Sequence, residues 1–473
     1  MEKNLIYQAV DAKSALLTEL SDEIWGYAEL SMEEFQSAAA YIRILQAEGF
    51  EVEENLCGIP TAFLGRYGSG KPVIGILGEY DALSGLSQEA ACTERKALIP
   101  GASGHGCGHN LLGAASLGAA IAIKEQIQAG ILSGTVVFYG CPGEEGCAGK
   151  TFMARDGMFR DLDAALCWHP GDTNEVTTGT CNASLQVEYT FTGTASHAAG
   201  DPEHGRSALD AAELMNIGVQ FLREHMPKSC CLHYSFLDAG GVSPNVVQPT
   251  ATVLYMVRGD SVRSAKALLA RVNKIAEGAA LMTETTFTSR QIDGTSDTVS
   301  NTVIEQLIYQ NLKLAPLPTY TAEEVAFAQA MKATCGEPKL PGNNLDLDKA
   351  AKKQVKEITD GGKLALNNFI MPYIPSSRMS AGSTDVGDVS WLAPTAQFTA
   401  AIWVSGSPGH SWQNVSGGKH PIAHKGLVYA AKVLAATAAD LMEQPEVLAK
   451  AKEEFLEATA DGYDCPIGKE VTF

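Results

Sequence analysis

The first part of the chain, up to about residue 180, alternates short apolar runs with helical stretches. The runs at 71–83, 134–140 and 162–170 are each bounded by glycine, proline or charged residues, a pattern typical of buried strands. Between the first two runs, residues 110–130 are rich in small side chains and predict a helix that packs closely on a sheet. The order strand, helix, strand predicts an α/β domain with a mostly parallel sheet and helices on both faces.

The pattern changes from about Ala183 onward. Residues 184–293 follow the order strand, helix, strand, strand, helix, strand, which is the split βαβ, ferredoxin-like pattern of a small α+β domain. The α/β pattern resumes near Asn301 and ends in a long C-terminal helix. We therefore predict that 183–298 is an inserted domain, and that 1–182 and 299–473 together form the main domain.

Two further stretches, one near residue 70 and one after residue 320, are rich in turn-forming residues. Residues from about 320 to 375 are polar and rich in turn residues, which predicts a surface insertion of undetermined role. The segment "GRYGSGKP" (65–72) mimics a phosphate-binding loop, but Pro72 replaces the hydroxyl residue that would bind magnesium, and a strand follows it. We interpret this segment as a hairpin turn.

Composition and charge narrow the class of protein. A chain of 473 residues exceeds one ordinary hydrophobic core, so two domains are expected. The net charge of −20 disfavours nucleic acid and anionic membranes as partners. The amphipathic N-terminus lacks the apolar core of a secretory signal, and no apolar stretch is long enough to span a membrane. The 11 cysteines lack framework spacing, which predicts reduced thiols and a cytoplasmic protein.

Acidic and imidazole side chains follow the predicted strands of the main domain. Because the carboxyl ends of parallel strands meet at one edge of a sheet, these side chains should converge. They are Glu79 and Asp81 after the first run, Glu144 and Glu145 after the second, His169 in the third, and His410 after residues 399–407.

The motif "GHGCGHN" (104–110) places Cys107 between two histidines. Cys107 could be a nucleophile, a metal ligand or a small residue in a tight turn. Its place at the start of a predicted helix favours the thiolate, which suits both the nucleophile and the ligand. A cysteine amidase needs neither two adjacent glutamates nor several further histidines. A zinc or manganese site does need several carboxylates and imidazoles, because these are its ligands. We therefore favour a metal site that includes Cys107 and His109.

The adjacent glutamates suit a division of labour. One carboxylate would bind metal, and its neighbour would take a proton from a metal-activated water and pass it to a leaving amine. This chemistry is the hydrolysis of an amide or a similar bond.

With these motifs placed, the chain resembles the co-catalytic metallopeptidase family of carboxypeptidase G, hippuricase and the auxin-conjugate amidohydrolases. Within that family it is most similar to the branch with the "HxCGHD" signature, and within that branch to the enzymes that hydrolyse aminobenzoyl-glutamate. The resemblance implies a metal-dependent amidohydrolase for N-acyl or N-aroyl amino acids, with p-aminobenzoyl-glutamate as the first expected substrate. It implies one or two divalent ions, Mn²⁺ or Zn²⁺, held by Cys107, His109, Glu145, His169 and His410.

Further roles follow only from the resemblance. Glu144 would be the general base, and Asp81 would orient a metal-binding residue. The segment "GTASHAAGDP" (193–202) matches the family's lid histidine, which makes His197 a stabiliser of the developing oxyanion. The segment "GGVSPNVVQPTATVLYMVR" (240–258) matches the stretch whose asparagine and arginine hold the substrate carboxylate, here Asn245 and Arg258.

The resemblance also implies an assembly. The inserted domain would be a lid and dimerisation domain, so we expect a homodimer through it or a hetero-oligomer with a related A subunit. A lid histidine could then act across the interface. The alternatives are a dipeptidase or aminoacylase of the same family, a partner subunit that needs a sister chain, and a cysteine amidase that uses Cys107.

The sequence departs from the branch at three places. Asn110 stands where the branch has aspartate, "GSTDVGDVSW" (382–391) replaces a common acidic stretch, and "GHSWQ" (409–413) replaces a histidine-rich ending, although His410 keeps its place. His105 is either a neighbour of the ligands or a ligand in place of one of them.

Overall fold

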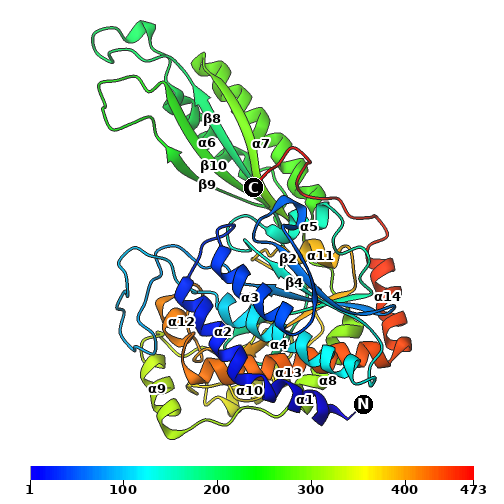
Figure 1. The fold of residues 1–473 in the computed structure, drawn as a ribbon. Helices are drawn as coiled ribbons and strands as arrows, with labels where there is room; N and C mark the ends of the chain where they lie inside the picture. The colour runs from blue at the N-terminus through cyan, green and yellow to red at the C-terminus, as the bar shows by residue number, and fades with distance from the viewer. Residues whose placement is uncertain (1) are drawn as a thin grey trace. The chain divides into compact units, whose positions relative to one another are not determined.

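The computed structural model describes residues 2–473 and divides the chain into two compact units (Figure 1). Unit 1 comprises residues up to Gly179, Val299–Arg378 and Val389–Gly462. Unit 2 comprises Thr180–Thr298 together with Met379–Asp388 and Tyr463–Phe473. Among the described residues, no helix is both long enough and apolar enough to cross a bilayer.

Unit 1 is built on a seven-stranded sheet with the order β1-β2-β4-β3-β5-β13-β6. The four central strands β4, β3, β5 and β13 are parallel, while β1, β2 and β6 pair antiparallel at the sides. The predicted fold class, a mostly parallel sheet beside an α+β unit, is therefore confirmed. The strands are β1 (Glu51–Glu54), β2 (Phe63–Ser69), β3 (Val73–Glu79), β4 (Gly134–Cys141), β5 (Ala164–Gly171), β6 (Glu175–Thr177) and β13 (Thr395–Ala401).

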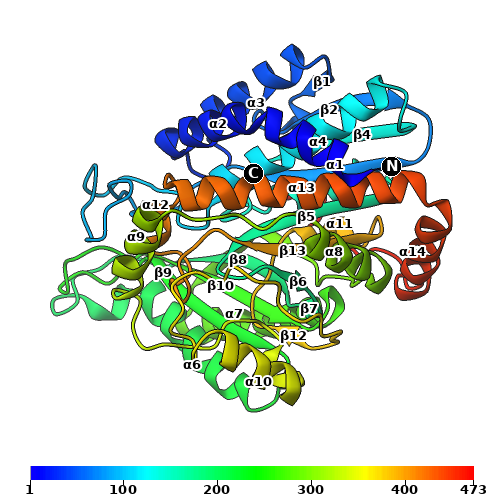
Figure 2. The ribbon, with the colours of Figure 1, turned by 90° about the horizontal axis from the view of Figure 1, so that it is seen from below.

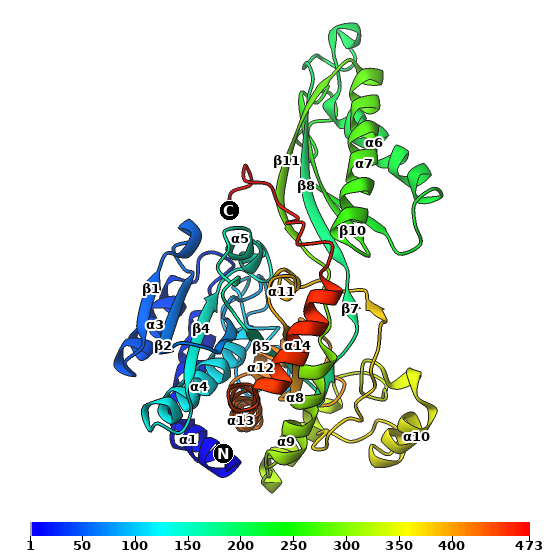
Figure 3. The same ribbon diagram turned by 90° about the vertical axis from the view of Figure 1, so that its right-hand side faces the viewer.

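Helices cover the sheet of unit 1, and α4 and α13 lie side by side along it (Figures 2 and 3). Small residues allow this close packing: at Gly113 of α4, a Cβ would lie 2.6 Å from the carbonyl oxygen of Glu79. The helices are α1 (Lys3–Ala12), α2 (Ser14–Tyr27), α3 (Phe35–Ala47), α4 (His109–Gln128), α5 (Gly149–Arg155), α8 (Thr302–Leu314), α9 (Ala322–Lys332), α10 (Lys349–Ile358), α11 (Val386–Ser390, shared with unit 2), α12 (Trp412–Gly417), α13 (Pro421–Glu443) and α14 (Pro445–Ala458).

The two faces of the sheet bury alternate residues of each strand, because successive side chains of a strand point to opposite sides. On β4, Phe138 joins the hydrophobic cluster that contains α4 and α13. Its neighbour Tyr139 faces the other side, where its ring lies 5.0 Å from that of Phe159 and its hydroxyl donates to the carbonyl oxygen of Met158. The segment that follows α5 therefore covers the second face.

The hairpin predicted at residues 65–72 is wrong. The turn joins β2 to β3, but β4 lies between these two strands and pairs with both. Thr135, at the start of β4, donates its backbone N–H to Pro72 and its hydroxyl to Gly70. The chain therefore reverses direction between β2 and β3, but the two strands do not pair, because β4 lies between them.

Unit 2 is a four-stranded antiparallel sheet, β11-β8-β10-β9, with α6 and α7 packed on it. Inward residues of the strands and of both helices form a separate hydrophobic cluster. Two segments from later in the chain add to the unit. Met379–Ser380 (β12) pairs with β7, and Asp464, near the C-terminus, forms an ion pair with Lys266 of α7. The other elements are β7 (Thr180–Cys181), β8 (Ala183–Thr192), α6 (Ala208–Arg223), β9 (Cys231–Asp238), β10 (Thr250–Gly259), α7 (Val262–Thr283) and β11 (Thr286–Thr295).

A buried carboxyl on α8 makes the stability of unit 1 depend on pH. Glu305 is 3% exposed and accepts a hydrogen bond of 2.9 Å from the hydroxyl of Tyr373. Burial raises the pKa of Glu305 to about 7, and the nearby charge of Glu454 adds to the effect. The folded protein therefore favours the protonated carboxyl. This contribution to stability is complete below pH 4.5 and is lost as the pH rises through 7.

We expect Glu305→Gln to stabilise the protein at pH 8 by up to about 3 kcal/mol and to change little at pH 4.5, because the amide cannot ionise. Urea unfolding at the two pH values measures the difference. The exposed Glu457→Gln on α14 is the control and should match the parent at both. Equal effects of Glu305→Gln at pH 4.5 and pH 8 would contradict the assignment.

Candidate metal centre

The carboxyl ends of the parallel strands bring the predicted ligands to one edge of the sheet. Glu79 ends β3, Glu144 and Glu145 follow β4, His169 lies in β5, and His410 follows β13. The loop before α4 adds Cys107 and His109. Gly108 makes its close approach possible: it has a φ of +82°, and a Cβ there would lie 2.5 Å from the ring of Trp403.

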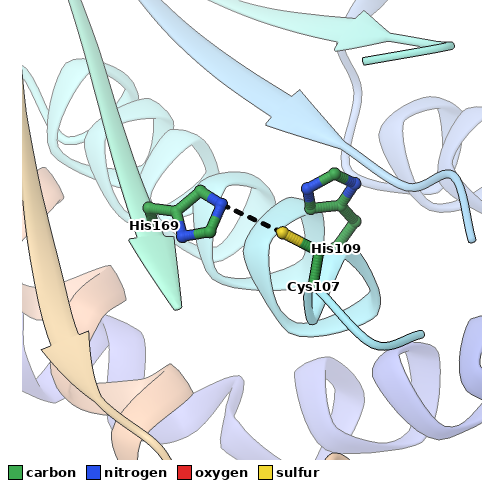
Figure 4. Close-up of side chains that lie close together, drawn as sticks. All are labelled: Cys107, His109 and His169. Carbon is green, nitrogen blue, oxygen red and sulfur yellow. Dashed lines mark hydrogen bonds between the residues drawn. The ribbon is translucent and has the colours of Figure 1, made fainter. Parts of the chain in front are cut away.

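Among the groups of side chains that could hold an ion, two overlap at Cys107. Cys107, His109 and His169 form the first group, and Cys107, Glu145 and His410 form the second. Within each group the candidate ligand atoms all lie within 4.8 Å of one another. The first group is shown in Figure 4, where the Cys107 sulfur lies 3.3 Å from Nε2 of His169.

His169 is held in the form that binds metals. Its Nδ1 donates a hydrogen bond of 2.8 Å to the carbonyl oxygen of Pro170, which leaves the lone pair on Nε2 pointing at Cys107. Burial lowers the pKa of His169, and the neighbouring His109 lowers it further. The ring is therefore neutral, as a ligand must be.

Asp81 holds one residue from each group. Its Oδ1 lies 2.8 Å from Nδ1 of His109, and its Oδ2 accepts the backbone N–H of Glu145 at 2.9 Å and the hydroxyl of Ser31. Burial alone would raise the pKa of Asp81, but the bond from His109 and the other donors lower it to about 2. The carboxylate thus stays ionised and aims Nε2 of His109 into the site.

Two atoms at the centre are buried without a hydrogen-bond partner among the described residues: Nε2 of His109 and Oε1 of Glu145. They lie 4.0 Å apart, and Nε2 of His410 lies 3.5 Å from the same Glu145 oxygen. A buried nitrogen and a buried carboxylate oxygen that lack hydrogen bonds are costly, and a cation between them would bind both. The nitrogen, oxygen and sulfur donors present fit a divalent ion of the zinc or manganese type.

The environment of Cys107 corrects one expectation. We expected its position before a helix to favour the thiolate, but burial raises the pKa of Cys107 to about 12, and the charges of Glu145 and Glu144 act in the same direction. Burial is the largest cause, and it outweighs the neighbouring His109, which lowers the pKa of the thiol. A thiol of this kind is a poor nucleophile and ionises readily only beside a cation, which favours the metal ligand over the cysteine amidase.

Glu144 lies in a third group with Glu79 and His109. Glu79 is buried and pairs with Lys150 of α5, whose Nζ lies 2.7 Å from Oε1, while Oε2 lies 3.3 Å from Nε2 of His109. Burial would raise the pKa of Glu79, but Lys150 and His109 lower it. Sequence reasoning noted Glu79 as a strand-end acid and missed Lys150, since no local pattern indicated that this lysine is completely buried.

His105 and Asn110 have supporting positions. Nε2 of His105 donates to the carbonyl oxygen of Ile24 at 3.1 Å, and His105 belongs to no group of candidate ligands in the described chain. Asn110 donates its amide to Ser21 at 3.0 Å and to the carbonyl oxygen of Gly418 at 3.3 Å. An aspartate could not donate these bonds, so the departure at Asn110 has a structural reason.

The remaining predicted site residues lie in unit 2. The loop of His197 pairs with that of Asn245: Ala198 donates its backbone N–H to the carbonyl oxygen of Asn245 at 2.9 Å. Nδ1 of His197 accepts the backbone N–H groups of Ala199 and Gly200, so in the neutral ring the proton is on Nε2. His197 and Asn245 therefore lie together at one end of the sheet.

Arg258 lies at the other end of β10, where its Nη1 donates to Ser383 at 2.9 Å. Eight residues of extended chain separate it from Thr250, where β10 begins, which is roughly 26 Å. Within one chain the structure therefore does not bring Arg258 together with Asn245, although the two were predicted to hold the same carboxylate.

Comparisons with known proteins agree on a family. The model described as peptidase family M20/M25/M40 matches residues 76–298. The B subunit of p-aminobenzoyl-glutamate hydrolase from Escherichia coli (strain K12) is 44% identical over 474 residues, covering 99% of this chain and 98% of that protein. The Xaa-Arg dipeptidase of Mus musculus is 26% identical over 461 residues, covering 95% and 90%.

Solved structures agree on the fold. A Bacillus subtilis protein described as a dinuclear metal-binding peptidase of the M20 family aligns with a TM-score of 0.54. The alignment covers 92% of this chain and 99% of that chain at 16% sequence identity. At this identity the match supports the architecture alone.

Lys150 supplies the positive charge that a cation would otherwise provide to Glu79. We expect Lys150→Met to destabilise the metal-free protein by about 3 kcal/mol or more, because a buried carboxylate loses its partner. Added Mn²⁺ should raise the melting temperature of this variant more than that of the parent. Thermal melting with EDTA and with Mn²⁺ measures both effects.

The control for this experiment is Lys353→Met on α10, whose side chain is 79% exposed and which should behave like the parent. An equal metal-induced shift in Lys150→Met and in the parent would show that Lys150 and the ion do not act on the same charge.

Proposed function

Because the chain belongs to the M20/M25/M40 peptidase family and is therefore a metal-dependent amidohydrolase, we propose that it cleaves the amide bond of an N-acyl or N-aroyl amino acid. The proposed substrate is p-aminobenzoyl-glutamate, with p-aminobenzoate and glutamate as products. The relative named for this reaction is 44% identical over 99% of the chain, which carries the substrate assignment. The convergence of candidate ligand atoms at Cys107, His109 and Glu145 carries the reaction class.

Metal binding is a property of the family, and we propose which residues of this chain are the ligands. Cys107, His109 and His169 would hold one ion, and Cys107, Glu145 and His410 a second, with Mn²⁺ or Zn²⁺ as the metal. A divalent ion in this position lowers the pKa of water and polarises a carbonyl group. Asp81 orients His109 and the backbone of Glu145 for this purpose.

Glu144 is the proposed general base. It follows β4 beside the ligand Glu145 but belongs to neither group that contains Cys107. Its carboxylate would take a proton from the attacking water and deliver it to the nitrogen of the leaving amine.

His197, Asn245 and Arg258 are the proposed substrate-binding residues. His197 carries its proton on Nε2, so it can donate a hydrogen bond to a developing oxyanion. Asn245 lies beside it, whereas Arg258 lies at the far end of β10. We therefore propose that Arg258 and the His197–Asn245 pair of one chain serve different sites. His197 and Asn245 would then act across a subunit interface.

The assembly that this requires would use unit 2, with residues 183–298 as the lid and residues 1–182 and 299–473 as the catalytic domain. β9 is an edge strand whose residues from His233 to Asp238 are exposed. On α6, Leu214, Ile217 and Phe221 form an exposed apolar stripe, and Phe221 is 71% exposed. An edge strand beside an apolar stripe is a surface that a second chain can cover. The proposed partner is a second copy or a related A subunit.

Two alternatives have specific support. The Xaa-Arg dipeptidase, 26% identical over 95% of the chain, favours a dipeptide as substrate. The relative at 44% identity is named as one subunit of a hydrolase, which favours a chain that needs a sister chain for activity. We place the protein in the cytoplasm, which the reduced thiols of Cys57, Cys107, Cys181 and Cys230 support.

The test of function is release of p-aminobenzoate from p-aminobenzoyl-glutamate by the purified, manganese-loaded chain. Hippurate, an N-acetyl amino acid and an Xaa-Arg dipeptide are assayed beside it. We expect Glu144→Gln to bind metal like the parent and to lose at least about a hundredfold in turnover, since a general base contributes that much. EDTA should abolish activity.

The control is Glu443→Gln at the end of α13, which should retain full turnover. Full turnover in Glu144→Gln would refute the mechanism. Turnover of the dipeptide alone would move the substrate assignment to the dipeptidase, and activity that appears only on adding an A subunit would assign the chain to a hetero-oligomer.

The interface is tested by Phe221→Asp, which places a charge in the apolar stripe. We expect this variant to be monomeric in sedimentation while its thermal stability is retained, because Phe221 is exposed within the chain. Turnover should fall with dimerisation because His197 and Asn245 would be lost from the partner's site. A monomeric variant with parental turnover would show that each chain is complete.

A further inference from the structure

His410 differs from the other candidate ligands in how it is held. His109 and His169 lie on a helix and a strand inside unit 1, whereas His410 lies on the loop of residues 402–411 and its side chain is 56% exposed. It also has a φ of +50°, in the left-handed region that few residues other than glycine adopt and in which asparagine, aspartate and histidine are enriched. The loop contains Gly406 and Gly409, which add conformational freedom. Something outside the loop must therefore fix it.

The insertion of residues 320–375, whose role the sequence left open, contacts this loop directly. Nζ of Lys332, the last residue of α9, donates to the carbonyl oxygen of Ser405 at 2.9 Å. The backbone N–H of Ser405 donates to the carbonyl oxygen of Ala365 at 2.8 Å. Gly406 donates its N–H to Asp172, also at 2.8 Å. Both backbone groups of Ser405 are thus occupied by the insertion.

Further contacts extend to the residues that follow His410. Gln413 donates its amide to the carbonyl oxygen of Thr334 at 3.2 Å, just beyond the end of α9. The ring of Phe327 stacks on His420 at 3.9 Å. Ala328 and Met331 of α9 share a small hydrophobic cluster with Val404 and Ile422. The insertion therefore holds the chain on both sides of His410.

The same loop is attached to the opposite side of the candidate site. Asn414 donates its amide to the carbonyl oxygen of Gly106 at 3.1 Å, next to Cys107. A Cβ on Gly106 would lie 3.4 Å from the backbone of His410. The position of His410 relative to Cys107 is thus set between the Gly106 loop and the insertion.

Lys332 is the charged group in this arrangement. Its ammonium donates to the carbonyl oxygen of Ser405, and the nearby charge of Asp172, which also binds Gly406, favours its charged form. A hydrogen bond to a charged group is stronger than one between neutral groups, so this bond is the strongest single side-chain contact from the insertion to the loop.

We propose that Lys332 is a positioning residue for His410: through Ser405 it fixes the loop so that Nε2 of His410 faces Glu145, and thereby completes the second metal-binding group. Lys332 itself touches neither the ion nor the substrate. The insertion thus has a function, which is to rigidify the one candidate ligand that lies on an exposed loop. This inference rests on the proposed ligand role of His410.

The experiment is a stepwise metal titration of the whole chain, with Mn²⁺ followed by calorimetry and bound ions counted by elemental analysis. His410→Ala is the reference variant and should lose the more weakly bound of two ions. We expect Lys332→Met to weaken that same ion about tenfold, as the loss of one charge-assisted hydrogen bond implies, and to leave the first ion unchanged. Lys332→Arg should restore binding, because it can still donate to Ser405.

The matched control is Lys363→Met. Lys363 lines the same cavity of about 590 Å³ as Lys332, but its side chain is 67% exposed and pairs with Asp360. This variant should bind both ions like the parent. Should Lys332→Met fail to fold, Gln413→Leu removes the contact on the other side of His410 and should weaken the same ion.

The outcomes separate the two proposals. Parental binding of both ions by Lys332→Met, with loss of one ion in His410→Ala, would overturn the positioning role and leave the ligand role intact. Parental binding by His410→Ala would overturn the ligand role itself. Loss of both ions in Lys332→Met, or no rescue by arginine, would show a general structural effect and would also overturn the proposal.

Discussion

The arrangement of the candidate site depends on one buried carboxylate, Asp81. Its two oxygens hold the imidazole of His109 and the backbone of Glu145, so a single side chain aligns a residue from each group of candidate ligands. Asp81 follows the parallel strand β3, and Gly113 of α4 lets that helix approach the end of this strand. The sheet, the helix and the ligands are therefore fixed together.

Charge balance is the second constraint on the site. Glu79, Asp81, Glu144 and Glu145 gather at one edge of the sheet, where Lys150 pairs with Glu79 and His109 pairs with Asp81. Burial raises the pKa of Cys107, and the charges of Glu145 and Glu144 add to the effect, so the metal-free protein keeps a neutral thiol where a charged ligand is needed. Folding thus creates an excess of negative charge that a divalent ion relieves, and binding of the ion is linked to release of a proton.

The site combines rigid and adjustable parts. His109 and His169 belong to regular elements of the core, whereas His410 depends on a loop that the insertion holds through Lys332 and Gln413. The residues proposed to bind substrate lie at opposite ends of the sheet of unit 2, with His197 and Asn245 at one end and Arg258 at the other. This separation is the reason for proposing an assembly in which each site draws on two chains.

The sequence by itself indicated the parallel strands, the α+β pattern of residues 183–298 and the residue types of the candidate site, but not that residues 379–388 and 463–473 join unit 2. Apolar runs of strand length and the motif around Cys107 are local signals, and the shared edge of parallel strands follows from their order. The hairpin at residues 65–72 failed because strand pairing is not local: β4 lies 65 residues further along the chain and took the position between β2 and β3. The pairing of Glu79 with Lys150, the raised pKa of Cys107 and the contact of Lys332 with Ser405 also depend on burial and on distant neighbours. Only the tertiary structure decides these, because desolvation and hydrogen bonding act between residues that no sequence period connects.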